Sequence, residues 1–159
     1  MYEHVLVGTD GSTTATRAVE AAARLAHTHQ ARLTIAYAFD PRQPVPVNHP
    51  AVPEEFTWRQ TVGGMAEAVV NEAVDRAQAA ACGGLRVDGR AEPGPPVAVL
   101  LAFVGELRPD LVVVGNADLH RVRLRRSIGH ALSRRVHGDV IIIDTVNRRD
   151  TPGGHRSVA

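Results

Sequence analysis

Five short apolar runs recur along this chain, and segments of helical length separate them. The runs cover residues 4–8, 32–39, 85–91, 110–114 and 140–143. Strands that alternate with helices through right-handed crossovers form a parallel sheet with helices on both faces. Most of the runs are apolar on both sides, as is typical of strands buried between two helical layers. We therefore predict an α/β fold with a doubly wound, Rossmann-like sheet of five parallel strands in the order 3-2-1-4-5.

The segments between the runs predict four helices, at about 13–27, from 54 or 56 to 81, 95–106 and 127–137. The inner face of the first helix is mostly small, which lets a helix lie close on a sheet: Ala15, Ala18, Val19, Ala22, Ala23 and Ala26. The third helix is expected to bury one apolar stripe: Val97, Leu100, Leu101 and Val104. Five prolines exclude regular structure from residues 40–53. We expect one domain at 1–146 and a disordered tail at 147–159.

The composition excludes several kinds of site. All 18 basic residues are arginine, so the lysine that a P-loop or a Schiff base requires is absent. The single cysteine, Cys82, cannot form an internal disulfide, and we expect it to be buried and reduced. No run approaches the roughly 20 apolar residues of a membrane helix, and no secretory signal is visible. We expect a cytoplasmic protein without membrane contact.

Two polar segments follow the strands that we expect at the centre of the sheet. Strands one and four are the most hydrophobic runs. Open parallel sheets bind ligands outside the carboxyl ends of their strands, at the point where the strand order reverses. The segments that fall there are residues 8–12, Gly-Thr-Asp-Gly-Ser, and the loop that begins at Gly115. The pattern thus predicts a ligand site between the first and fourth strands.

The same segments resemble those of a known family. Val-Leu-Val-Gly-Thr-Asp-Gly-Ser at 5–12, Pro-Asp-Leu-Val-Val-Val-Gly-Asn at 109–116 and the stretches at 127–136 and 139–144 are similar to the universal stress proteins. The match extends over residues 2–145. The resemblance implies a five-stranded parallel α/β fold, a dimer and, in the best-known subgroup, the binding of ATP.

The nucleotide-binding signature of that subgroup is only partly kept. It consists of Gly, two residues, Gly, nine residues and then Gly with Ser or Thr, because glycines let backbone N–H groups approach phosphates at a helix N-terminus. Gly115 matches the first position, whereas Asp118 replaces the second glycine. Arg126 and Ser127 occupy the final pair, after a spacer of seven residues at 119–125. The loop therefore lacks two of the glycines and is two residues shorter.

Carried over position by position, the resemblance implies a nucleotide site. Asp10 stands where the family places an acidic group near adenine or ribose, and Ala38 matches the position after the second strand. The implied binding residues are Gly8, Thr9, Asp10, Ala38, Val114, Gly115, Arg126, Ser127 and Ile128. The adenosine side is kept, but the phosphate side is altered, because the Asp118 carboxylate repels phosphates unless a metal ion intervenes.

Arginines offer one compensation for the altered loop. Residues 115–137 contain six arginines and one acidic residue, a local net charge of +5 in a chain whose total is +1. Arginine binds phosphate in bidentate geometry, so these side chains could replace the lost glycines. A basic loop that binds no ligand remains an equal alternative.

Two classes of function follow from these observations. The first is an adenine-nucleotide-binding stress-response or signalling protein, with ATP, ADP, AMP or a cyclic nucleotide as ligand, with or without Mg²⁺. The second is a ligand-free regulatory module that acts through a homodimer, in which the apolar edge strand from Val140 to Ile143 pairs with its copy. Nucleic-acid binding through the arginines is disfavoured, because no aromatic residues that could stack on bases lie among them.

No catalytic set of residues is visible in the sequence, so we expect at most a slow, incidental hydrolysis of ATP. Asp10 lacks the further acids and the lysine of a receiver domain, and Gly8 and Gly11 lack the third glycine of a dinucleotide fingerprint. His27 and His29 have the spacing of metal ligands but no accompanying Cys or acid. We predict no metal centre in the protein itself.

Overall fold

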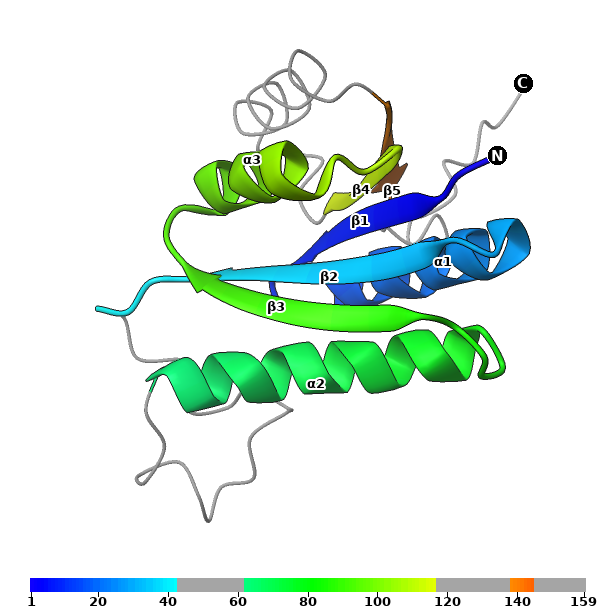
Figure 1. Ribbon diagram of the computed structural model, residues 1–159. Coiled ribbons are helices and arrows are strands. Elements are labelled where there is room, and N and C mark those ends of the chain that lie inside the picture. Colours follow the sequence, from blue (N-terminus) through cyan, green and yellow to red (C-terminus); the bar gives the residue numbers. More distant parts are fainter. Residues whose placement is uncertain (43–61, 117–137, 145–159) are drawn as a thin grey trace, which may run out of the picture.

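The computed structural model describes residues 1–42, 62–116 and 138–144 (Figure 1). Its elements are β1 (His4–Thr9), α1 (Thr13–His29), β2 (Arg32–Phe39), α2 (Val62–Ala80), β3 (Val87–Pro93), α3 (Pro96–Leu107), β4 (Leu111–Asn116) and β5 (Asp139–Asp144). The predicted alternation of strands and helices is confirmed for this part of the chain. The helix predicted at 127–137, most of the proline-rich segment and the tail at 147–159 lie outside the described residues.

All five strands run parallel in the order β3-β2-β1-β4-β5, as the sequence predicts. β1 lies at the centre, between β2 and β4 (Figure 1). The chain first winds from β1 through β2 to β3 and then returns to the other side of β1. The reversal between β1 and β4 is the predicted switch point.

Successive residues of each strand face opposite helical layers. Val5 and Val7 pack with α1 and α2 on one face, in a cluster that also contains Leu33 and Ile35 of β2. Leu6 packs with α3 on the other face. Figure 1 shows α3 on one side of the sheet and α1 and α2 on the other. The small residues predicted for the inner face of α1 are all buried.

The third strand lies two residues further along the chain than predicted. It covers Val87–Pro93 because Gly83 and Gly84, both at positive φ, turn the chain after α2 and leave Leu85 buried in that turn. Pro93 is tolerated because β3 is an edge strand. The neighbouring Gly94 N–H donates to Phe39 O on β2 at 2.8 Å, so the Pro93 nitrogen faces the open edge.

The apolar stripe predicted for α3 is confirmed at Leu100 and Val104, which are buried together with Val99 and Phe103, whereas Val97 and Leu101 are only partly buried. The predicted burial of the cysteine is wrong. Cys82 is exposed rather than buried, because it lies beyond the end of α2 at a φ of 54°, where the chain turns away from the helix.

Candidate functional site

The carboxyl ends of β1, β2 and β4 meet at one edge of the sheet. Gly8 is in register with Ala36 on β2 and with Val114 on β4. Thr9 and Gly115 follow these residues, and Gly115 is exposed. The structure therefore brings together Gly8, Thr9, Val114 and Gly115, four of the residues that the sequence assigns to the site.

The loop between β1 and α1 is held by its own side chains. Asp10 Oδ1 accepts hydrogen bonds from Ser12 N at 3.0 Å and from Ser12 Oγ at 2.6 Å. Thr9 Oγ1 accepts from Gly11 N at 3.2 Å, and the φ of 76° at Gly11 is one that a residue without a Cβ adopts without strain. Ser12 caps α1, since its Oγ accepts from Ala15 N at 3.2 Å. Hydrogen bonds within the loop therefore fix its conformation at the start of α1.

This arrangement leaves part of the Asp10 carboxylate available. The hydrogen bonds of the described residues engage Oδ1, and Asp10 is exposed to solvent. Its second oxygen, Oδ2, can accept hydrogen bonds from a ligand. The N-terminus of α1 begins beside it at Thr13 and favours negative charge nearby.

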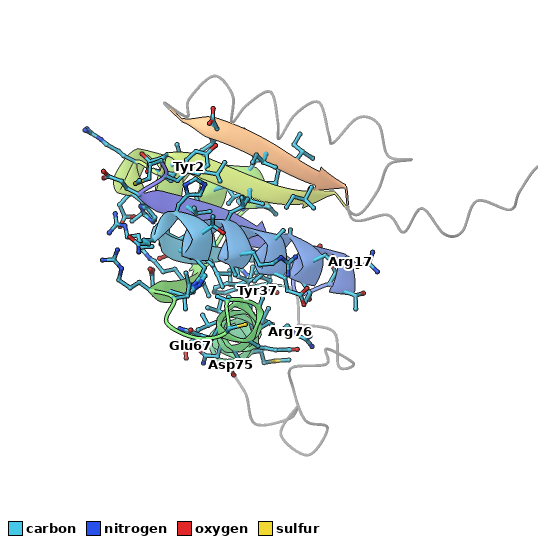
Figure 2. The ribbon with its side chains drawn as sticks, turned by 90° about the vertical axis from the view of Figure 1, so that its right-hand side faces the viewer. Tyr2, Arg17, Tyr37, Glu67, Asp75 and Arg76 are labelled. Atoms are coloured by element: carbon cyan, nitrogen blue, oxygen red, sulfur yellow. The ribbon has the colours of Figure 1, made fainter. Side chains whose placement is uncertain are left out.

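Tyr37 is a neighbour of this site that the sequence analysis missed. It is the register partner of Thr9, and Figure 2 shows its side chain between the sheet and α2. Burial raises the pKa of Tyr37, and the negative charge of Asp10 raises it further. The ring is stacked on that of Phe39, with centroids 6.4 Å apart. An aromatic residue near the end of a strand, next to a polar loop, was the available signal.

The α3 side of the same edge is made of small residues. Gly8 lies directly under Leu100, since a Cβ built on Gly8 would come within 3.2 Å of Leu100 Cδ2. Ala36 and Ala38 follow on β2 and pack in the same cluster. The missing Cβ of Gly8 thus makes room for the Leu100 side chain, which covers this part of β1.

The Ala38 carbonyl provides a hydrogen-bond acceptor there. Arg32 N–H donates to Glu3 O on the β1 side at 3.0 Å, and the alternation of a strand directs the backbone groups of Ala38 to that side as well. The register of β1 and β2 ends at Thr9 and Tyr37, one step before Ala38. The next donor of a continued ladder would be Gly11 N–H, which instead donates to Thr9 Oγ1.

A small cavity lies between the loop that follows β1 and the helices α1 and α2. It has a volume of about 20 Å³ and is lined by Thr9, Gly11, Thr16, Val19, Val69, Glu72, Ala73 and Arg76, from the loop, α1 and α2. This volume accommodates a water molecule and excludes a nucleotide.

The remaining predicted residues, Arg126, Ser127 and Ile128, lie outside the described part of the chain, as does Asp118. Within the described part, no three His, Cys, Asp or Glu side chains are grouped so that they could hold a metal ion. His29, one of the two weighed as metal ligands, packs edge-on against Tyr2 with ring centroids 4.9 Å apart.

Comparison with known proteins identifies the family. The model of the universal stress protein family matches residues 1–144. The chain belongs to the universal stress protein family. The resemblance noted from the sequence, and the fold that it implied, are thereby confirmed.

Relatives in this family match the chain over nearly its whole length. Universal stress protein Rv1636 of Mycobacterium tuberculosis is 35% identical over 146 residues, which cover 91% of this chain and 97% of the relative. A crystal structure of a universal stress protein in complex with cAMP is 34% identical, with a TM-score of 0.67, and covers 91% of this chain and 98% of its own. The universal stress protein UspA from Lactobacillus plantarum, 24% identical with a TM-score of 0.65, shares the fold over 90% of this chain and 98% of its own.

None of the described helices combines the length and the apolar composition that crossing a membrane requires.

Proposed function

We propose that this universal stress protein binds an adenine nucleotide at the carboxyl edge of the sheet, between β1 and β4. The observation that carries the proposal is the geometry of Asp10. Its Oδ1 is occupied by Ser12, which leaves Oδ2 available in the loop that directly follows β1 at the carboxyl edge of the sheet. A related protein, 34% identical to this chain, has been crystallised with cAMP, which supports the same ligand class.

Each group at the edge has a role in this proposal. Asp10 Oδ2 accepts a hydrogen bond from a ribose hydroxyl. The Ala38 carbonyl accepts one from the base, and Gly8 supports the edge from below, because its missing Cβ leaves room for Leu100. Thr9, Val114 and Gly115 form the wall between the base and the phosphates. Arg126, Ser127 and Ile128 are proposed to face the phosphates on the strength of the sequence resemblance.

The altered loop favours a ligand with few phosphates. Two lost glycines and a shortened spacer reduce the number of backbone N–H groups, and the Asp118 carboxylate opposes a triphosphate. We therefore place AMP, ADP and a cyclic nucleotide on an equal footing with ATP. Mg²⁺ would be needed only with ATP or ADP, where it would screen the Asp118 carboxylate from the phosphates.

We propose binding rather than catalysis as the role of the site. Asp10 is oriented by Ser12, and the hydrogen bonds given for the described residues join it to no histidine and no second carboxylate. General acid–base or nucleophilic chemistry needs such a partner within hydrogen-bond distance. Hydrolysis of bound ATP would then be slow.

A homodimer is the second part of the proposal. β5 is an edge strand, and its Ile142 side chain is 48% exposed. An unpaired apolar edge favours association with another strand, and a second copy of β5 is the simplest partner. If no nucleotide binds, this dimer acts as a ligand-free regulatory module, which is the alternative function. The proposed cellular location is the cytoplasm.

The first experiment is to denature the purified protein and identify any released nucleotide by mass spectrometry. It is followed by titration with ATP, ADP, AMP and cyclic AMP while the melting temperature is recorded. Binding to the native state raises the melting temperature, and the shift grows with the logarithm of the ligand concentration relative to its Kd. A protein that releases no nucleotide and shows no shift with any of the four would contradict the proposal and favour the ligand-free module.

The variant Asp10→Asn tests the site itself. Asparagine keeps an acceptor for Ser12 but replaces the free carboxylate oxygen by an N–H donor. We expect a nucleotide affinity lower by at least about tenfold with an unchanged fold, since one charged hydrogen bond is lost. Asp75→Asn is the matched control, because Asp75 lies on the outer side of α2 (Figure 2). Equal affinities of the two variants would show that the site is assigned wrongly.

A further inference from the structure

β3 carries alternating charged residues on the α3 face of the sheet. Arg90 identifies that face, because its guanidinium lies 4.6 Å above the ring centroid of Phe103 and donates to Glu106 at 2.7 Å, both on α3. Asp88, two residues earlier, accepts from Thr34 of β2 at 3.1 Å. Glu92, two residues after Arg90, lies on the same face.

The position of Glu92 is fixed relative to the proposed base site. It is the register partner of Ala38, and the bond from Gly94 N to Phe39 O continues the pairing beyond it. Paired residues on neighbouring strands are about 4.8 Å apart and direct their side chains to the same face. The Glu92 carboxyl group is thus the charged group next to the acceptor that Ala38 offers.

The Glu92 side chain forms only a long ion pair within the protein. Its carboxylate lies 3.7 Å from the Arg90 guanidinium, beyond a hydrogen bond, whereas Glu106 accepts a hydrogen bond from the same guanidinium at 2.7 Å. The Glu92 side chain is also 47% exposed. Arg90 is therefore held by Glu106 and Phe103, and Glu92 retains its capacity to accept hydrogen bonds.

We infer that Glu92 selects the base of the bound nucleotide by accepting a hydrogen bond from an exocyclic amino group. This inference rests on the proposed function, in which the base lies over Ala38. An amino group at position 6 of a purine donates to the carboxylate. A keto oxygen at the same position would face it with like partial charge and lose affinity.

The test compares AMP with inosine monophosphate, which differ at position 6 of the base and in the proton on N1. Affinities of the wild-type protein, Glu92→Gln and Glu106→Gln are measured by calorimetry, and circular dichroism verifies the fold. We expect the wild type to prefer AMP by about tenfold, the size of one hydrogen bond to a charged acceptor at a partly exposed site. Glutamine can accept from an amino group or donate to a keto group, so Glu92→Gln should bring the two affinities close together.

The control variant distinguishes a direct contact between Glu92 and the base from an indirect effect through Arg90. Glu106→Gln weakens the pairing of Arg90 without touching the base side, and the preference for AMP should persist. An unchanged preference in Glu92→Gln, or the same loss in Glu106→Gln, would overturn the inference while leaving nucleotide binding intact. A wild-type protein that binds neither of these two nucleotides, nor ATP, ADP or cyclic AMP, would instead refute the proposed function, and with it this role of Glu92.

Discussion

His4 Nε2 lies 2.9 Å from Thr34 Oγ1, and both side chains are buried. The Thr34 hydroxyl donates its single proton to Asp88 Oδ1, so it accepts from His4 and assigns the proton of the neutral ring to Nε2. The other ring nitrogen, Nδ1, is buried and has no partner in the described part of the structure. This chain of hydrogen bonds links β1, β2 and β3 at the edge opposite the proposed site.

Acid should weaken the fold through His4. Burial lowers its pKa below the usual 6.5 and the charge of Arg32 lowers it further, while the Leu107 carbonyl, Asp88 and Asp110 act in the opposite direction. Because the folded pKa is lower than the unfolded one, the unfolded chain takes up the proton more readily. Stability is therefore complete above about pH 6.5 and is lost as the pH falls from that value through the folded pKa.

Urea unfolding of the wild type and of His4→Gln measures this effect. The urea concentration at the unfolding midpoint of the wild type should decrease as the pH is lowered below about 6.5, and that of His4→Gln should decrease less. His27→Gln, at an exposed position of α1, should retain the wild-type dependence. Identical slopes for all three proteins would show that His4 does not govern it.

Both tyrosines of the chain should ionise above pH 10. The hydrogen bond from Tyr2 to Asp139 Oδ2, at 2.8 Å, raises the pKa of Tyr2, and burial followed by the charge of Asp10 raises that of Tyr37. Their contributions to stability are thus present below the unfolded pKa of about 10 and lost as the pH rises through the folded values. Titration of the phenolate absorbance should show Asp139→Asn shifting one group downward and Asp10→Asn the other. A single transition near pH 10 in the wild type would be evidence against both contacts.

Gly8→Ala should destabilise the protein by about 1–2 kcal/mol, because the new methyl group meets Leu100 Cδ2 at 3.2 Å and Cδ1 at 3.3 Å. The tip of the leucine has to move aside within a packed cluster. Gly105→Ala in α3 is the control, since its Cβ would meet nothing within 4 Å, and it should stabilise the helix by about 0.5–1 kcal/mol. Chemical unfolding measures both changes. Equal effects would mean that the contact under Leu100 is loose.

Ile142→Asp should prevent the proposed dimer. The substitution places a charge in the middle of the apolar edge of β5, where a paired strand would bury it without a partner. Light scattering at micromolar concentration should give a dimer for the wild type and a monomer for the variant, while Ala79→Asp on the exposed side of α2 should remain dimeric. A monomeric wild type would remove the dimer from the proposal.

The sheet could be predicted well from the sequence because several features of each strand indicate the same structure. Runs such as that of β4 are apolar on both faces and end at glycine, which leaves few alternatives to a buried parallel strand. The stripe of α3 could not be predicted in the same way. The helix is apolar nearly all round, from Val97 to Val104, so only packing against Leu6 and Ala36 decides that Val99 and Phe103 face the sheet.

The candidate site was predictable only in outline. Motif and topology locate Gly8, Asp10 and Gly115, because these follow from the ends of strands. The neighbours Tyr37 and Glu92 depend on the register between strands, which a single sequence specifies poorly. The phosphate side, at Arg126, Ser127 and Ile128, remains a prediction.

The two edges of the sheet differ in what can be added to them. β3 presents the proline nitrogen of Pro93 outward and carries charged residues, whereas β5 presents Val140 to Ile143. A further strand can therefore extend the sheet at one end only. If two copies join through β5, the edges that remain are the two β3 strands, which do not accept a further strand. The association then ends at a closed pair and cannot propagate into a fibre.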